Sequence, residues 1–155
     1  MENCGLMKKA IKKELAISDS FLRAAKSDLN SARILLASGE YSNSLYHSQQ
    51  AIEKILKAMI ALKGRFIFKH EVIAEFCSAF KKTVSPDFIA LLQDKGFKIE
   101  QEGSSFRYPD FSGTVIFDPT EGFSKADAKE GYRTAKEIVA ATLKELKKVK
   151  TAVPK

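Results

Sequence analysis

The sequence has few residues from which a disulfide framework or a metal centre could be built. It contains two cysteines, Cys4 and Cys77, and two histidines, His47 and His70. Two cysteines far apart in the chain indicate neither a disulfide framework nor a thiolate zinc site, so we expect both thiols to be free. The two histidines have no dense group of acidic residues beside them, so we predict no metal site, and the sequence implies no cofactor.

Motifs and long apolar runs that mark several other protein classes are also missing. There is no glycine-rich loop for binding phosphate and no nucleophile elbow of the hydrolase type. No apolar run reaches about 18 residues, the length typical of a membrane span. Residues 1–13 are partly basic but lack the apolar stretch and cleavage site of a secretory signal. We therefore predict a cytoplasmic protein without membrane-spanning segments.

What is present is typical of one globular domain. The chain has 155 residues, of which 45% are hydrophobic and 29% are charged, and it shows no internal repeat and no second apolar core. A chain of this length buries enough surface to fold without disulfides or metal, so we expect a single domain over residues 1–155. The net charge of +7 favours polyanionic partners, although lysines near the two ends supply much of it.

Apolar residues recur at helical spacing in the first half of the chain. The pattern from Ser18 to Leu36 predicts a long helix that ends at Gly39, and a second pattern stops near Gly64. The short gap between them predicts an antiparallel helical hairpin. The apolar faces comprise Leu22, Ala25, Leu29, Ala32 and Leu36 in the first helix and Leu45, Ser48, Ile52, Ile55, Met59 and Leu62 in the second.

Three further helices are predicted after the hairpin. Residues 70–82 have helical spacing, and Ser85 followed by a proline supplies the cap and first turn of a helix reaching about residue 99. Ser124 and Asp127 match a capping box, which starts a final helix that continues nearly to the C-terminus. Each of these segments has one apolar face, so the helices are expected to pack on the hairpin.

The periodicity fails between Glu100 and Phe123, where glycines and prolines interrupt the pattern. We predict a long ordered loop here, in which residues 114–117 could pair as a short strand, and we note that long loops in compact domains are often functional. The predicted fold class is therefore all-α, an up-and-down helical bundle of about five helices with a long ordered loop before the last helix.

The second predicted helix begins with polar and small residues, Tyr41-Ser-Asn-Ser-Leu-Tyr-His-Ser-Gln-Gln-Ala-Ile-Glu-Lys-Ile-Leu-Lys-Ala. This segment resembles the second-helix signature of the HEPN family, Gln-Ala-x-Glu-Lys-x-Leu-Lys, which residues 50–57 match. Together with His70 and Arg107-Tyr108-Pro109-Asp110, the resemblance covers about residues 18–148. It implies a freestanding prokaryotic HEPN protein, related to the helical domain of kanamycin-type nucleotidyltransferases.

The resemblance also implies partners. Proteins of this kind are often paired with a separately encoded nucleotidyltransferase in modules that resemble toxin-antitoxin systems. We therefore expect a homodimer that contacts nucleotide, RNA or such a nucleotidyltransferase. A purely structural interaction module is an alternative, in which aromatic side chains pack at interfaces and bind no nucleotide; these are Tyr41, Tyr46, Phe106 and Phe111.

A stripe of polar residues on the second helix is a candidate for binding nucleotide or RNA. His47, Gln50, Lys54 and Lys57 lie three or four residues apart, which predicts a common face opposite the apolar seam. The stripe could line a groove for phosphate, or it could be the solvated face that every amphipathic bundle helix has. Glu53, four residues before Lys57, could form a solvated ion pair with it.

Arg107 is the strongest single candidate for a phosphate contact, with Tyr108 and Asp110 beside it. An arginine is always charged and donates two parallel hydrogen bonds, and the flanking aromatic residues Phe106 and Tyr108 suit stacked bases. The alternative is a structural ion pair between Arg107 and Asp110.

The family resemblance also bears on catalysis. Many ribonucleases of the family carry an arginine followed a few residues later by a histidine, and cleave RNA without metal. Arg107 stands at the corresponding place, but no histidine follows it before Gly113. Arg65 and His70 have the right spacing but lie too early in the chain. In the preferred interpretation both histidines are structural. Metal-independent ribonuclease activity is the alternative, and its candidate catalytic residues are Arg107 and His70.

Overall fold

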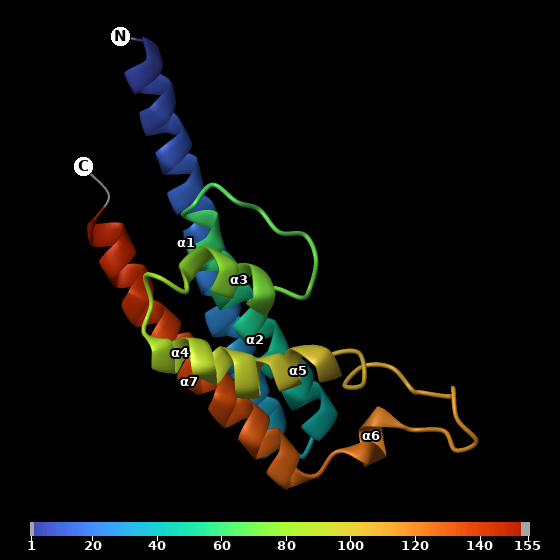
Figure 1. The fold of residues 1–155 in the computed structure, drawn as a ribbon. Helices are drawn as coiled ribbons and strands as arrows, with labels where there is room; N and C mark the ends of the chain where they lie inside the picture. The colour runs from blue at the N-terminus through green and yellow to red at the C-terminus, as the bar shows by residue number, and fades with distance from the viewer. Residues whose placement is uncertain (1, 153–155) are drawn as a thin grey trace.

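The predicted helical hairpin forms the first half of the molecule (Figure 1). The computed structural model describes the backbone of residues 2–152 and the side chains of residues 11–152. Helix α1 (Glu2–Ala37) is followed by α2 (Tyr41–Ala61), and Gly39 between them has a φ of 84°, which favours glycine. Helix α1 begins at Glu2 rather than at the predicted Ser18. Its first turns are rich in Lys, Ala, Leu and Glu, which have high helix propensity.

The last helix, α7 (Lys125–Thr151), packs against α2 and also contacts α1. Its predicted capping box is confirmed: the Asp127 amide donates to Ser124 Oγ at 3.1 Å, and the Ser124 amide donates to the Asp127 carboxylate at 2.7 Å. Gly131 allows the close approach of α7 to α2, because a Cβ atom there would lie 2.4 Å from Leu45 Cδ2. Helices α1, α2 and α7 therefore form the body of the bundle.

Four short helical segments cover one side of this body: α3 (Ile73–Phe80), α4 (Pro86–Leu91), the π-helical turn η1 (Leu92–Gly96) and α5 (Phe97–Glu102). Helices α4, η1 and α5 follow one another without a break, so the helix predicted from residue 86 is confirmed and reaches slightly further. Ser85 caps it by accepting from the Phe88 amide at 3.2 Å. The helix predicted over 70–82 is shorter at both ends.

Aromatic side chains fill the core between the short helices and α2. Phe76 stacks on Phe80 with ring centres 4.9 Å apart and meets Phe88 edge-on at 5.8 Å. All three rings are buried and belong to one core cluster that also contains Ile55 and Met59 of α2. This packing attaches the residues from α3 to α5 to the hairpin.

The segment between α5 and α6 (Pro119–Gly122) is the predicted loop, and it projects from one end of the bundle (Figure 1). The predicted strand over 114–117 is wrong: the described residues contain only one isolated bridge, between Asp110 and Phe117. Its two backbone hydrogen bonds measure 3.0 and 2.8 Å. An isolated two-stranded pairing is only marginally stable in water, and Val115 and Ile116 are exposed here, with no apolar surface against which a strand could pack.

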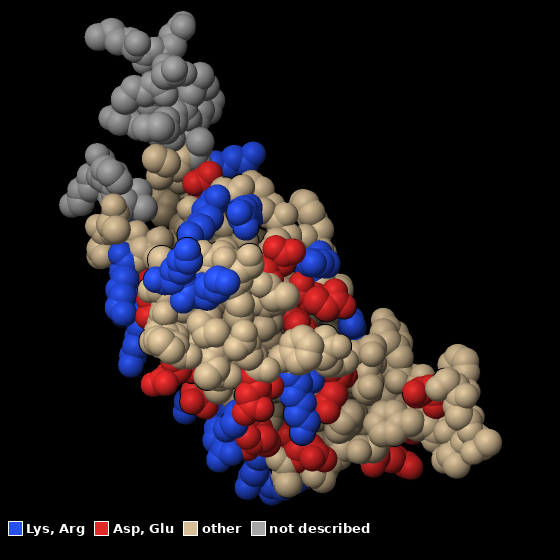
Figure 2. Space-filling model, viewed as in Figure 1, with Lys and Arg blue, Asp and Glu red and all other residues tan. Residues whose placement is uncertain are grey.

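The all-α fold class is confirmed. Within residues 2–152, no helix is both long enough and apolar enough to cross a membrane. Figure 2 shows Lys and Arg interspersed with Asp and Glu over the visible face of the body, whereas the outer part of the projecting loop shows acidic and uncharged side chains. The loop and the body therefore differ in charge, which matters for what each can bind.

Candidate functional site

The polar residues predicted to form an outer stripe of α2 lie mostly at its contacts with other elements. Gln50 and Lys57 are buried, with exposed fractions of 7% and 8%. The prediction of a stripe on a free outer face is wrong for these two residues. The physical reason is that α2 is the central helix, in contact with α1, α3, α5, α6 and α7, so it has no broad face left for solvent.

Glu53 is the centre of one buried polar group. Lys57 Nζ donates to Glu53 Oε1 at 2.7 Å, and the amide groups of Gln49 and Gln50 donate to Oε2 at 3.3 and 3.2 Å. His70 Nδ1 lies 3.1 Å from the same oxygen. The predicted pair between Glu53 and Lys57 does form, but the expectation that it is solvated is wrong, because Glu53 is only 4% exposed.

Asp28 on α1 is the centre of a second polar group. Its carboxylate lies 2.8 Å from His47 Nδ1 and accepts from Lys54 Nζ at 2.5 Å. Asp28 is itself buried, and both partners are about one-third exposed. His47 and Lys54 therefore join α2 to α1, as the structural interpretation of His47 expected.

Glu100 on α5 is a polar residue that sequence reasoning missed. Its Oε1 accepts from the backbone amides of Val72 and Ile73, at 2.6 and 3.0 Å, and so caps the start of α3. Burial raises the pKa of the Glu100 carboxyl above its ordinary value, although these two hydrogen bonds act in the opposite direction. The missing cap residue at Val72 was a signal that a partner from elsewhere in the chain was needed.

Arg107 lies against two aromatic rings. Its guanidinium carbon is 5.1 Å from the centre of the Tyr46 ring on α2 and 5.3 Å from that of Tyr108. Among the described residues, no carboxylate lies within 4 Å of the guanidinium group, so the predicted ion pair with Asp110 is wrong. Asp110 instead accepts from the amide and hydroxyl of Ser112 at 2.9 and 2.7 Å.

These contacts form a continuous surface, which we call the Arg107 surface and define as Tyr46, His47, Arg107 and Tyr108. The Tyr46 and His47 rings meet edge to face with centres 5.1 Å apart. The Tyr108 ring is largely exposed. Three residues predicted from sequence, His47, Arg107 and Tyr108, are thus brought together, and Tyr46 is the member that the binding prediction omitted.

His70 and Arg107 are not brought together by their contacts within one chain. Arg107 lies on Tyr46, and His70 lies on Glu53, seven residues further along α2. Seven residues of α-helix span about 10 Å. The two candidate catalytic residues therefore contact different levels of the same helix.

The remaining reactive side chains form no metal centre. Within the described part of the chain, no three His, Cys, Asp or Glu side chains are grouped so that they could hold a metal ion. Cys77 is buried in α3, and burial raises the pKa of its thiol, with a smaller contribution from Glu100. The side chain of Cys4 lies outside the described residues.

Comparison with known proteins gives consistent matches. The chain is 30% identical over 123 residues to a protein of Methanocaldococcus jannaschii named "Putative toxin MJ1304", covering 77% of this chain and 81% of that protein. Its fold is similar to that of TT1696 from Thermus thermophilus, with a TM-score of 0.68 and 20% identity over 82% of this chain and 96% of the other.

A second solved structure, ST0689, described as an archaeal HEPN homologue, has a TM-score of 0.62 and 22% identity, covering 83% of this chain and 96% of that one. Both structures support the same helical fold. The family model described as the HEPN domain matches residues 18–146, which is most of the chain. The protein therefore belongs to the HEPN domain family.

Proposed function

We propose that this chain is a toxin-like HEPN protein that binds single-stranded RNA, or a nucleotide, through the Arg107 surface. One observation carries the proposal: Arg107 is stacked on the rings of Tyr46 and Tyr108 and has no carboxylate within 4 Å among the described residues. A guanidinium group that is oriented by aromatic rings keeps its N–H donors available for phosphate. The relative named as a toxin supports the toxin-like part.

The aromatic residues of the Arg107 surface are suited to contact the base of a nucleotide. Tyr108 has an exposed fraction of 61%, so one face of its ring can stack on a base without any other side chain moving far. Stacking of this kind is worth about 1–3 kcal/mol per base and tolerates any base sequence. The net charge of +7 adds a long-range attraction for a polyanion. We therefore expect affinity for RNA with little sequence preference.

Binding is a better match to this geometry than cleavage. His70 lies on Glu53, about 10 Å along α2 from the contact of Arg107. A proton-transfer group has to come within hydrogen-bonding distance of the reacting hydroxyl. Cleavage by Arg107 and His70 would therefore need the histidine of another copy or a large movement, and metal-independent ribonuclease activity remains the alternative.

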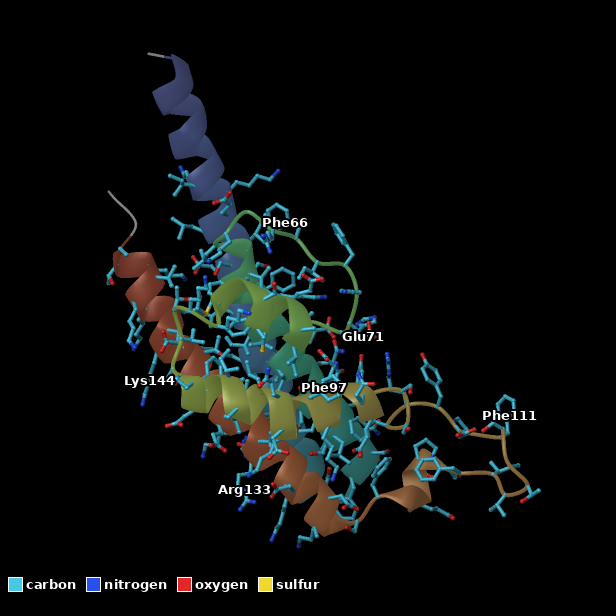
Figure 3. The ribbon with its side chains drawn as sticks, in the orientation of Figure 1. Phe66, Glu71, Phe97, Phe111, Arg133 and Lys144 are labelled. Atoms are coloured by element: carbon cyan, nitrogen blue, oxygen red, sulfur yellow. The ribbon has the colours of Figure 1, made fainter. Side chains whose placement is uncertain are left out.

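The exposed loop favours a second role, in binding protein. Phe111, Val115 and Ile116 are each more than two-thirds exposed, and Figure 3 shows Phe111 at the tip, away from the bundle. Residues 103–123 carry three carboxylates and one arginine, whereas the chain as a whole is positive. A second copy of this chain supplies a complementary positive surface, so a homodimer is the assembly we propose; a separately encoded nucleotidyltransferase is the other candidate partner.

Fluorescence anisotropy with a labelled RNA of mixed sequence tests the main proposal. We expect Arg107→Ala to weaken binding about tenfold, since one phosphate contact and one ring contact are lost. Arg33→Ala is the matched control, because Arg33 is also exposed and has no carboxylate within 4 Å among the described residues, but lies on α1. If the two substitutions weakened RNA affinity equally, the effect would be one of general charge, and the proposal that RNA binds at the Arg107 surface would be contradicted.

Measurements at two salt concentrations and a cleavage assay complete the test. Binding through phosphate should weaken as salt rises, whereas binding of a purely interaction-making module to RNA should be absent at both. The same RNA, incubated with chelator and the wild type, Arg107→Ala or His70→Ala, reports cleavage. Cleavage by the wild type that both substitutions abolish would favour the ribonuclease over the binding role.

A further inference from the structure

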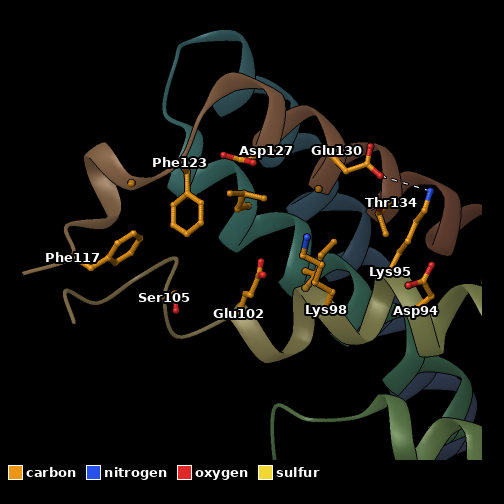
Figure 4. A pocket seen from close by; sticks show the side chains of 14 residues that line it. Asp94, Lys95, Lys98, Glu102, Ser105, Phe117, Phe123, Asp127, Glu130 and Thr134 are labelled. Atoms are coloured by element: carbon orange, nitrogen blue, oxygen red, sulfur yellow. Dashed lines mark ion pairs between the residues drawn. The ribbon is translucent and has the colours of Figure 1, made fainter. Parts of the chain in front are cut away.

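A cavity of about 640 Å³ lies between η1, α5, the first turns of α7 and the segment that contains Ser105, Phe117 and Phe123 (Figure 4). Part of its wall is apolar: Leu45, Ile99, Phe117 and Phe123 line it. The Phe117 and Phe123 rings meet edge to face, 5.6 Å apart. The volume is sufficient for a small organic molecule.

The shape of this cavity depends on a close contact at Gly122. A Cβ atom at that position would lie 2.3 Å from Cε2 of the Phe117 ring. Because real Cβ atoms do not come so close to an aromatic carbon, any larger residue would push the ring out of place. Gly122 therefore allows the Phe117 ring to lie close to the backbone of α6, where it lines the cavity.

The rim of the cavity has more negative than positive groups. Four carboxylates and two lysine ammonium groups line it. Lys95 and Arg133 both pair with Glu130, and the hydrogen bonds from Ser124 lower the pKa of Asp127, which keeps it charged. Among the described residues, Glu102 has no cation within 4 Å. A locally negative cavity in a chain of charge +7 disfavours phosphate and favours a cation.

A hydroxyl group that makes no hydrogen bond within the described part of the chain also faces the cavity. Thr134 on α7 lines it and is 2% exposed, yet its side chain makes no hydrogen bond to any described residue. Thr142, two turns later on the same helix, shows the usual arrangement and donates to the Ile138 carbonyl at 2.7 Å. Figure 4 shows the Thr134 side chain on the cavity side of α7. Among the described residues, Ser18 Oγ is the only fully buried side-chain oxygen without a partner, so the Thr134 hydroxyl oxygen is open to the cavity and can bind a ligand there.

We propose that this cavity binds a small organic cation, an alkylammonium or guanidinium group carried on an apolar stem. The cationic group lies between the Glu102 carboxylate and the faces of Phe117 and Phe123, where both ion pairing and cation–π attraction act. The stem packs on Leu45 and Ile99, and a donor N–H reaches the Thr134 hydroxyl. None of the residues that line this site belongs to the Arg107 surface.

Lys98 is the residue that competes with such a ligand. It lines the cavity and stands four residues before Glu102 on the same helix, so its ammonium group can approach the carboxylate that the ligand would use. It also contributes to the lowered pKa of Asp127. Removing this charge should therefore strengthen binding of a cation, whereas it would weaken binding of an anion.

Isothermal titration of the full-length protein with spermidine and with agmatine tests the proposal, with adenosine monophosphate as an anionic control. We expect saturable binding of at least one cation, weakened roughly fivefold by Glu102→Gln and strengthened by Lys98→Met. Thr134→Val should weaken it by a smaller factor. Glu137→Gln is the control, since Glu137 is an exposed carboxylate of α7 outside this cavity. Circular dichroism confirms that each variant is folded.

Three results would overturn the proposal. The first is the absence of saturable binding of either cation by the wild type at millimolar concentration. The second is an equal loss of cation affinity in Glu102→Gln and Glu137→Gln, which would show that the cations are attracted to surface carboxylates in general. The third comes from a capped peptide with one lysine or arginine: binding of the peptide, sensitive to Glu102→Gln, without binding of the free amines would assign the cavity to a protein side chain.

Discussion

The guanidinium group of Arg107 lies over the ring of Tyr46, 5.1 Å from its centre, so that a residue of the projecting loop is held against the central helix of the bundle. The contact has two effects. It restricts the rotamers of a long side chain that would otherwise lose much conformational entropy on binding. It also leaves the edge of the guanidinium group, rather than its face, for a ligand.

Tyr46 should therefore contribute to RNA affinity without touching the phosphate. We expect Tyr46→Leu to weaken RNA binding about two- to fivefold, which corresponds to a cation–π contact of roughly 0.5–1 kcal/mol at an exposed site. Tyr46→Phe keeps the ring and should bind like the wild type. Anisotropy titrations of the three proteins measure the difference. Equal weakening by both substitutions would instead indicate that the hydroxyl matters.

Glu53 should be important for stability because it is the only carboxylate that contacts buried Lys57 within the described residues. Glu53→Gln leaves the Lys57 ammonium group buried without a counter-charge, and we expect a loss of about 3–5 kcal/mol in the free energy of unfolding. Lys69→Met removes one partner of the exposed pair with Glu75 and should cost less than about 1 kcal/mol. Urea denaturation of both variants checks this. Similar urea midpoints for the two variants would show that the buried pair contributes no more to stability than the exposed pair.

The stability of the protein should depend on pH through Glu100. Its pKa in the folded state is raised above the ordinary value of 4.5, so the folded protein binds this proton more tightly than the unfolded chain does. The contribution of Glu100 to stability is therefore full below about pH 4.5 and is lost as the pH rises through the raised pKa. Glu100→Gln cannot ionise, so its stability relative to the wild type should increase as the pH rises above about 4.5.

Melting temperatures of the wild type and Glu100→Gln across this pH range test the direction. The exposed Glu137→Gln is the control, and its difference from the wild type should change little with pH. If the difference in melting temperature between the wild type and Glu100→Gln stayed constant with pH, the capping hydrogen bonds, and not ionisation, would determine the stability effect at this position.

The apolar loop tip should determine the oligomeric state if a second copy covers it. We expect Phe111→Ser, alone or with Ile116→Ser, to shift the protein from dimer to monomer with unchanged helix content. Phe68→Ser is the matched control, because Phe68 is 93% exposed but belongs to the connection between α2 and α3. Size-exclusion chromatography with light scattering gives the mass. A wild type that is monomeric at high concentration would contradict the homodimer and favour a different partner.

The helices could be predicted from sequence wherever their ends are set by neighbouring residues. Gly39, Ser85 and the capping box at Ser124 each act within a few positions of the helix end that they define, so the local pattern contains the information. The projecting loop was predicted for the same reason. The strand suggested for residues 114–117 is absent from the structure. Strand pairing depends on a neighbouring strand, and the pattern of one segment does not show whether one is present.

The environment of the polar residues on α2 could not be predicted in this way. Asp28 contacts His47 and Lys54 from another helix, and Glu100 caps α3 across 28 positions of sequence. Helical spacing shows that polar residues share a face, but it does not show whether water or another helix covers that face. The same limit applies to Arg107, whose contact with Tyr46 joins residues far apart in the chain.

The loop after α5 has a further consequence, because it supplies both places where we expect ligands. Ser105 lines the cavity, Phe106 is buried against Phe123, and Arg107 lies on Tyr46. Three consecutive residues thus face the proposed cation site, the core and the proposed RNA surface in turn. If a ligand at one site shifts this backbone and changes the affinity at the other, the change is equal in both directions. We therefore expect amine concentration to act as an allosteric effector of RNA binding.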